Sequence, residues 1–195
     1  MKCLMSRKLK QIVTLQTLRK PPHAKAVGRI GDARYWQINK TIHTMAKVLT
    51  FSRTFPSYHL RAGEGTNFIQ KVLVGLGVTG SIQEVGFDIE NYDPKFHTVR
   101  AGERWKVGDK FSPRVWSGKP YASKQITIAP DVEIKKVFRI VSDGVLWYID
   151  NQPAISDTIK KLAANDGLSY EEFLDWFKYK PFIGQIICWD ENINY

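Results

Sequence analysis

The segment Lys95–Arg100, with the sequence Lys-Phe-His-Thr-Val-Arg, carries an amine, a hydroxyl and a guanidinium close together. Side chains alternate across a strand, so Thr98 and Arg100 share one face if the segment is extended. The preceding Asp93-Pro94 pair favours a bend, and that bend would bring Lys95 to the same place. We therefore expect a small polar site with groups suited to catalysis, while a solvated basic strand is the simpler alternative.

The formal net charge of +10 is unevenly distributed along the chain. Residues 1–44 hold ten Lys and Arg against the single acid Asp32, whereas residues 45–195 hold 19 basic and 18 acidic residues. Within that second part, residues 95–124 carry eight basic and two acidic side chains. The aromatic residues interleaved with them are Trp105, Phe111, Trp116 and Tyr121. Such a mixture suits a surface that neutralises phosphate and stacks bases, unless the rings are core and the charges simply face water.

We expect residues 1–44 to be a basic extension and residues 45–195 to form a single domain. Three interpretations of the extension stay open: a disordered arm, a targeting segment, or an upstream extension of the reading frame with the natural start at Met45. The last is favoured, because Met45 opens directly onto the first clean strand. No apolar run has the length of a membrane span, and Cys3 and Cys188 form no metal-ligand spacing. These observations favour a cytoplasmic protein without a metal or another cofactor.

The elements that must position the site can also be predicted. Apolar runs and alternation predict strands over residues 48–51, 98–99, 106–111, 125–129, 132–141, 145–149 and 183–189. Helical periodicity predicts one helix with Thr66 as its N-cap, a second that Gly167 ends, and a third that a capping box from Ser169 to Glu172 opens. The fold class is α+β, and the central strands indicate an antiparallel sheet exposed on one side.

The pattern of Lys95, Thr98 and Arg100, followed by Trp-Lys-Val-Gly-Asp at 105–109, resembles the signature of the ASCH family of PUA-like domains. That signature has a lysine leading into Thr-hydrophobic-Arg, and then a Lys-x-Gly-Asp turn. The order of elements over residues 48–189 is similar to the family as well. The resemblance implies a PUA-like small β-barrel, or a strongly curved mixed sheet, with flanking helices. It also implies a pocket at this motif for a nucleic acid or a nucleotide-related ligand.

One branch of that family, the small bacterial amidohydrolases, removes the acetyl group of N4-acetylcytidine with a lysine, a threonine and a late glutamate. By this resemblance Lys95 and Thr98 match the lysine and the threonine, Arg100 matches the arginine that ends the strand, and Asp166 stands at the place of the glutamate. A Thr hydroxyl needs a neighbouring base, and a lysine can be that base if burial lowers its pKa. Thr98 would attack the amide carbonyl, Lys95 would accept its proton and Asp166 would orient Lys95. Arg100 would position the substrate or stabilise the oxyanion.

Two polar and aromatic loops, at residues 51–61 and 116–121, are of the kind that lines a binding cleft. The further candidates for ligand binding are Arg53, His59, His97, Arg104, Trp116, Lys119 and Tyr121. We expect a domain that binds RNA or a modified nucleoside in a basic cleft around Lys95, Thr98 and Arg100, because binding requires only the basic and aromatic surface. Hydrolysis of N4-acylated cytidine is the alternative, and it requires in addition that Lys95, Thr98 and Asp166 converge. A non-enzymatic domain that binds an acidic protein is the third hypothesis, and the oligomeric state stays open.

Overall fold

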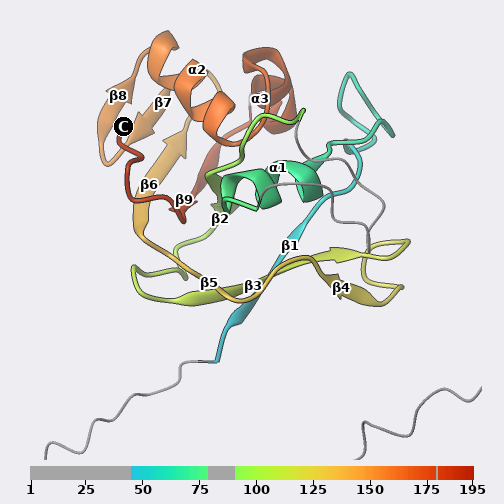
Figure 1. Cartoon of the computed structure of the whole chain (residues 1–195). Helices are drawn as coiled ribbons and strands as arrows, with labels where there is room; N and C mark the ends of the chain where they lie inside the picture. The colour runs from blue at the N-terminus through green and yellow to red at the C-terminus, as the bar shows by residue number, and fades with distance from the viewer. Residues whose placement is uncertain (1–44, 79–90, 179) are drawn as a thin grey trace, which may run out of the picture. The chain divides into compact units, whose positions relative to one another are not determined.

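The computed structural model describes residues 45–78, 91–178 and 180–195, so the expectations for residues 1–44 lie outside it. Nine strands and three helices lie in the described ranges (Figure 1). The strands are β1 (Lys47–Phe51), β2 (His97–Ala101), β3 (Lys110–Trp116), β4 (Gln125–Thr127), β5 (Val132–Glu133), β6 (Lys136–Ser142), β7 (Trp147–Ile149), β8 (Gln152–Ala154) and β9 (Phe182–Cys188). The helices are α1 (Phe68–Gly75), α2 (Ser156–Asn165) and α3 (Tyr170–Phe177).

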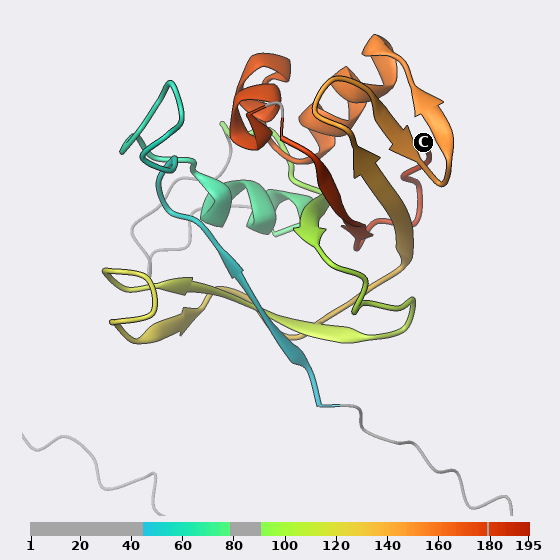
Figure 2. The ribbon, with the colours of Figure 1, turned by 180° about the vertical axis from the view of Figure 1, so that it is seen from behind.

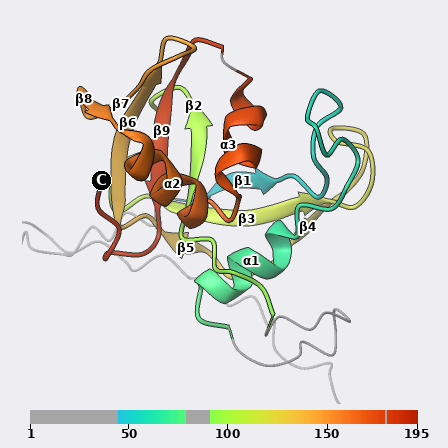
Figure 3. The ribbon, with the colours of Figure 1, turned by 90° about the horizontal axis from the view of Figure 1, so that it is seen from above.

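The described strands form two sheets (Figures 1 and 3). In the first sheet, β3 pairs in parallel with β1 and in antiparallel fashion with β4 and β5. The second sheet is antiparallel and has the order β2-β9-β6-β7-β8. The predicted α+β class is confirmed, and the central strands pair in antiparallel fashion as expected, although they are divided between two sheets. Among the described strands, the parallel pair is that of β1 with β3. It arises because α1 and β2 lie between these strands in the chain and supply the long crossover that a parallel pair requires.

The strand predicted over residues 132–141 is in fact two strands, because the chain changes sheets at Ile134 and Lys135. The N–H of Ile134 donates to the carbonyl of Asp109, next to β3, at 2.9 Å. The N–H of the next residue, Lys135, donates at 2.8 Å to Cys188, the last residue of β9 in the other sheet. Ile134 is completely buried at this crossing, so one continuous segment links the two sheets through the core.

The helix ends follow their sequence signals. Gly167 follows α2 with φ of +72°, a conformation in which a residue with a Cβ would be strained. At α3, the Ser169 hydroxyl accepts the N–H of Glu172 and the Glu172 carboxylate accepts the N–H of Ser169, so the predicted capping box is confirmed. The N-cap of α1 is Asn67, one residue after the expected Thr66.

The helices α2 and α3 cover one face of the second sheet, as Figures 2 and 3 show. The most deeply buried apolar side chains include Phe51, Phe111, Ile140, Phe173 and Ile186. Each such side chain stabilises the fold by about 1.5–3 kcal/mol relative to an exposed position. This packing fixes the C-terminal end of α2 against β2, the strand that carries the candidate site.

Candidate functional site

Within the described residues, β2 pairs with β9 alone and therefore lies at an edge of the second sheet. The main-chain N–H of Val99 in β2 helps to lower the pKa of Asp166, the residue at the end of α2. Alternation along β2 places His97 and Val99 toward one face of the sheet and Thr98 and Arg100 toward the other.

Lys95 and Asp166 form a buried ion pair at the entrance to β2. The Lys95 Nζ lies 2.6 Å from Asp166 Oδ1, and it also donates to the main-chain carbonyl of Asp166 at 2.6 Å. Lys95 is 1% exposed and Asp166 is 7% exposed. Asp166 is the C-cap of α2, and the partial negative charge of a helix C-terminus also favours an ammonium. Two of the three residues predicted to be catalytic are therefore in direct contact.

Burial opposes the charge on both members of this pair. It lowers the pKa of Lys95 to about 8, against the raising effect of the Asp166 carboxylate. Burial likewise raises the pKa of Asp166, although the ammonium of Lys95 acts in the opposite direction. The ring of Phe68 lies 4.3 Å from the Lys95 Nζ and favours its charged form. Lys95 thus gives up its proton far more easily than an exposed lysine, as a general base must.

Two glycines allow the chain to pack closely around Lys95. A Cβ on Gly75 would lie 1.9 Å from the Lys95 carbonyl oxygen, so α1 can end against Lys95 only with glycine there. A Cβ on Gly167 would lie 3.4 Å from the Lys95 Cβ and 3.1 Å from the side chain of Lys71. Sequence reasoning missed the contribution of Gly75 and of Phe68 to the site. The only available signal was their position in a predicted helix, which does not reveal what the helix packs against.

Thr98, the predicted nucleophile, is 3% exposed and pairs with Ile187 of β9. No hydrogen bond among the described residues joins its hydroxyl to Lys95, whose Nζ donates to Asp166 instead. The amine and the carboxylate are thus assembled, while no hydrogen bond among the described residues joins the Thr98 hydroxyl to either of them.

The structure places His97 in the interior, with no exposed surface through which it could contact a nucleic acid. Its Nε2 lies 3.1 Å from the Leu162 carbonyl of α2. Its Nδ1 lies 3.5 Å from Asp166 Oδ1 and has no hydrogen-bond partner among the described residues. The ring of Tyr195 packs edge-on against the imidazole at 5.7 Å. His97 therefore belongs to the buried surroundings of the ion pair and not to a binding surface.

His59 is also buried, and its contacts are structural. Its Nδ1 accepts the N–H of Arg61 at 3.0 Å, and its Nε2 lies 3.0 Å from the Glu172 carbonyl of α3. The ring stacks on Phe55 with 4.4 Å between centroids and meets Trp176 edge-on. Because both ring nitrogens are occupied, His59 ties the loop after β1 to α3 and is not available to a ligand.

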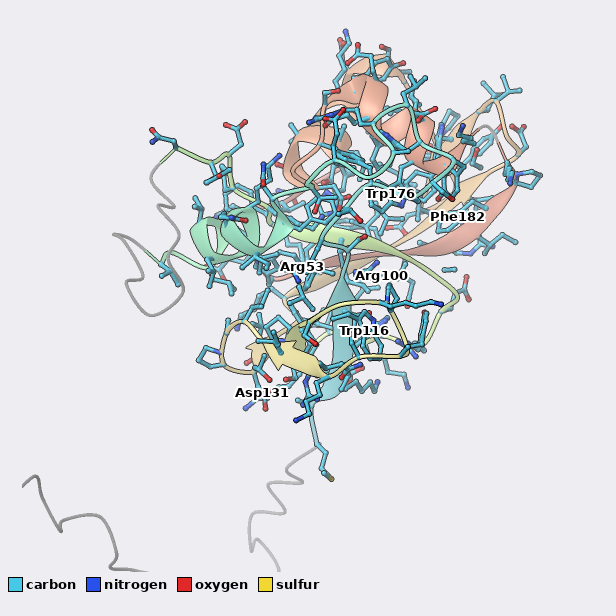
Figure 4. The ribbon with its side chains drawn as sticks, turned by 90° about the vertical axis from the view of Figure 1, so that its right-hand side faces the viewer. Arg53, Arg100, Trp116, Asp131, Trp176 and Phe182 are labelled. Atoms are coloured by element: carbon cyan, nitrogen blue, oxygen red, sulfur yellow. The ribbon has the colours of Figure 1, made fainter. Side chains whose placement is uncertain are left out.

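A cavity of about 390 Å³ lies between the loop after β1 and the β3–β4 hairpin. Its lining includes the rings of Phe51 and Trp116 and the side chain of Arg53. The Arg53 Nη1 donates to the carbonyl of Ser117 at 3.0 Å, so its guanidinium joins the two segments that form the cavity. Arg53 and Trp116, two of the predicted binding residues, therefore lie in the same concave surface (Figure 4).

Arg100 extends from β2 toward this cavity. Its guanidinium lies over the ring of Phe51, 5.5 Å from the centroid, and its Nη2 donates to the carbonyl of Thr50 at 2.7 Å. Since Phe51 lines the cavity, Arg100 sits directly behind the cavity wall and is partly buried there. The face of β2 that carries Thr98 and Arg100 is thus the face turned toward the cavity.

The β3–β4 hairpin presents three of the predicted binding residues beside the cavity. The rings of Trp116 and Tyr121 lie 5.3 Å apart, and Tyr121 is 91% exposed with φ of +62°. A tyrosine held open to water in this uncommon conformation is a position where function is a reasonable hypothesis. Lys119 is exposed on the same hairpin, and Arg104 is exposed with its guanidinium 5.1 Å from the Trp105 ring centroid.

Among the described residues, no group of three or more His, Cys, Asp or Glu side chains is arranged to hold a metal ion. In the same part of the chain, none of the helices has the length and apolar character of a membrane span. Comparisons of the chain with protein-family models, with curated proteins and with solved structures found no match. The site must therefore be interpreted from its own geometry.

Proposed function

We propose that this chain is an ASCH-type, PUA-like domain that binds RNA or a modified nucleoside, with the cavity at Phe51, Arg53 and Trp116 as its ligand site. The observation that carries the proposal is the cavity itself, which combines aromatic rings with a guanidinium on one concave surface. Ligand pockets have volumes of about 300–1,000 Å³, so a cavity of about 390 Å³ has room for a nucleoside.

Charge distinguishes this cavity from its larger neighbour. A larger cavity of about 440 Å³, whose lining includes Gly167, also has Asp93 and Glu172 in its wall, and their carboxylates would repel a phosphate. Its lysine, Lys71, donates to the carbonyl of Gly167 at 2.6 Å. The first cavity has Arg53 in its wall and the exposed Lys119 beside it. A phosphate-bearing ligand is therefore favoured at the first cavity, with a base stacked on Trp116 or Tyr121.

Binding can be tested by fluorescence anisotropy with a labelled single-stranded RNA of about eight nucleotides, a length within the usual site sizes. We expect Trp116→Ala and Arg53→Ala each to weaken binding by roughly 10-fold or more, since a base–aromatic stack contributes about 1–3 kcal/mol. Lys160→Ala is the matched control, because Lys160 is exposed on α2 and bonds only to Asp157 among the described side chains. Affinity should also fall steeply between about 50 and 200 mM salt.

Two results would overturn the binding proposal. One is the absence of RNA and nucleoside binding at low salt. The other is equal weakening by Lys160→Ala and by the cavity variants, which would mean that the RNA responds to charge anywhere on the surface. An acidic protein would then become the better candidate for a ligand.

Amide hydrolysis of N4-acylated cytidine is the second candidate function, and the Lys95–Asp166 contact favours it. A lysine with a pKa of about 8 is available as a neutral base near the pH of the cell. In this reaction the Thr98 hydroxyl oxygen would bond to the acyl carbon, Lys95 would take the hydroxyl proton, and the amine of cytidine would leave with a proton from Lys95. Water would then hydrolyse the acyl-threonine ester and regenerate the hydroxyl.

The hydrolase candidate is tested by incubating the protein with N4-acetylcytidine and following the release of cytidine. We expect Thr98→Ala and Lys95→Met to abolish turnover, while Trp116→Ala should raise KM more than it lowers kcat. Absence of turnover, or turnover that survives Thr98→Ala, would remove this candidate and leave binding as the function.

A further inference from the structure

His97 has a buried nitrogen that the proposed chemistry does not use. The imidazole is completely buried on β2, and its Nδ1 approaches Asp166 Oδ1 at 3.5 Å without a partner among the described residues. An unpaired polar atom in the core costs about 1–3 kcal/mol unless something compensates for it. Because this nitrogen faces the carboxyl group of the ion pair, the Asp166 side chain is the group that can compensate for it.

The other ring nitrogen fixes the tautomer. The Nε2 lies 3.1 Å from the carbonyl of Leu162, which can only accept a hydrogen bond, so the proton of the neutral imidazole is on Nε2. Burial and the nearby ammonium of Lys95 hold the pKa of His97 well below its usual value, which keeps the ring neutral. The Nδ1 therefore presents a lone pair to Asp166, and a lone pair attracts a protonated carboxyl group but repels a carboxylate.

We propose that His97 is a positioning residue that accepts a hydrogen bond from protonated Asp166 and so keeps the nitrogen lone pair of Lys95 free. One proton moves in this step: the Lys95 ammonium passes it to the Asp166 carboxylate, and the resulting O–H points to His97 Nδ1. The neutral amine of Lys95 can then donate its two N–H groups to the Asp166 carboxyl oxygen and main-chain carbonyl, both 2.6 Å away. Without His97, the Asp166 proton would return to the Lys95 nitrogen, which lies 2.6 Å from Asp166 Oδ1.

This inference rests on the hydrolase candidate, because a free lone pair on Lys95 matters only if Lys95 acts as a base. It assigns to His97 a function that neither its burial nor its contact with Leu162 requires. A purely structural His97 would fill space and bond to Leu162, and its replacement would leave the proton equilibrium of Lys95 unchanged.

The other groups around the ion pair do not accept the Asp166 proton as we propose for His97. The positive charges of Arg100 in β2 and Lys71 in α1 disfavour the ammonium form of Lys95, whereas the ring of Phe68 favours it. On the side of His97, the titratable groups are Tyr195, whose ring contacts the imidazole, and Cys188, which pairs with His97 across β2 and β9. Burial raises the pKa of both, to about 12 for Cys188, so they stay neutral near pH 7. Lys136 of β6, which pairs with Cys188, donates to the carbonyl of Ile193 at 2.9 Å.

The first test is the tautomer of His97 in the unmodified full chain. Nitrogen NMR of the histidine ring distinguishes an imidazole protonated at Nε2 from one protonated at Nδ1. We expect the Nε2–H form near neutral pH, with an Nδ1 signal shifted by hydrogen bonding. A ring protonated at Nδ1 would donate to the Asp166 carboxylate and would overturn the proposal at once.

The second test is the titration of Lys95 itself, followed by the carbon-13 shift of its Cε and assigned with the Lys95→Met variant. His97→Phe keeps the ring volume but removes the acceptor, so the pKa of Lys95 should rise by about 0.7, which is roughly a fivefold change in its amine-to-ammonium ratio. Tyr195→Phe is the matched control, because it keeps the ring beside His97 and should leave the titration of Lys95 unchanged. An unchanged pKa in His97→Phe would refute the inference.

Neither measurement depends on turnover or on a ligand, so the inference and the proposed function can fail separately. A shifted Lys95 titration without hydrolysis of N4-acetylcytidine would retain the proton arrangement and remove the reaction. Hydrolysis whose pH profile is the same in His97→Phe and in the unmodified chain would retain the reaction and remove the role of His97. If His97→Phe does not fold, the tautomer measurement still decides.

Discussion

Removing one member of the Lys95–Asp166 pair should destabilise the fold far more than removing both. Lys95→Met leaves a carboxylate at a position that is 7% exposed, and Asp166→Asn leaves an ammonium at a position that is 1% exposed. Breaking a buried ion pair costs about 3–5 kcal/mol, because the remaining charge has lost its solvent and its partner. Each single variant should therefore lose a large part of the total stability, which is about 5–15 kcal/mol for a typical domain.

The double variant Lys95→Met/Asp166→Asn removes both charges and keeps their approximate shapes. Apolar or neutral replacement of a whole buried pair is often neutral or stabilising, so we expect the double variant to lie within about 2 kcal/mol of the unmodified chain. Since the two single effects would add to about 6–10 kcal/mol, the coupling free energy should be at least about 4 kcal/mol.

Urea unfolding at neutral pH, followed by circular dichroism, measures all four proteins of this cycle. The slope of unfolding free energy against urea should stay constant, which shows that the variants unfold from the same native state. Single effects that simply add in the double variant would show that the two groups are not coupled. Single effects below about 1 kcal/mol would place the pair in water and refute the burial on which both the base and the role of His97 depend.

Three further predictions concern the surroundings of the pair. The pKa of Lys95 is about 8 in the fold, against 10.5 in the unfolded chain. The unfolded state therefore binds more protons than the folded state between these two pH values. As a result, the contribution of Lys95 to the free energy of unfolding should rise by about 3 kcal/mol from pH 8 to pH 10.5. Urea unfolding of the unmodified chain and of Lys95→Met at several pH values measures this contribution as the difference between their free energies of unfolding. If the unmodified chain lost stability relative to Lys95→Met as the pH rises, the predicted direction would be wrong. Gly75→Ala should lower the free energy of unfolding by about 1–3 kcal/mol, because the added Cβ would meet a main-chain oxygen at 1.9 Å. Gly118→Ala is the control for the same assay and should cost much less, because the nearest atom to its Cβ is at 3.6 Å. Ser169→Ala should cost about 1 kcal/mol by removing the capping box of α3, and a thermal midpoint unchanged from the unmodified chain would contradict this.

Local chemistry made much of the fold predictable from the sequence. The capping box at Ser169 and the left-handed Gly167 act within a few residues, so the end of α2 and the start of α3 could be placed closely. The pairing of β1 with β3 could not, because nothing within either strand specifies a partner far away in the chain. The division of residues 132–141 into two strands failed for a related reason: the change of sheet at Ile134 is decided by hydrogen bonds to Asp109 and Cys188, which are distant in sequence.

The site shows the same division between local and tertiary information. Residue types and spacing pointed to Lys95, and the resemblance to the ASCH signature pointed to Asp166; the two side chains are 2.6 Å apart in the structure. They did not reveal that His59 and His97 are buried, because a histidine in a polar loop or strand has the same signature whether it faces water or the core. Both rings bond to helix carbonyls, of Glu172 and Leu162, and only the packing of α2 and α3 brings those carbonyls near.

Access to Lys95 decides which of the two candidate functions this arrangement can perform. Lys95 is 1% exposed, and its amine lies against the ring of Phe68. Phe68 lines a small pocket that shares Arg53 with the cavity but does not itself line the cavity. A base that stacks on Trp116 can bind without any change in the protein. The ring of Phe68 covers the Lys95 Nζ and is itself packed on Trp176 of α3, so we expect hydrolysis to need a movement of Phe68. Of the two proposed functions, binding would use the state described here, whereas hydrolysis would use a second state in which the contact between Phe68 and Trp176 is broken.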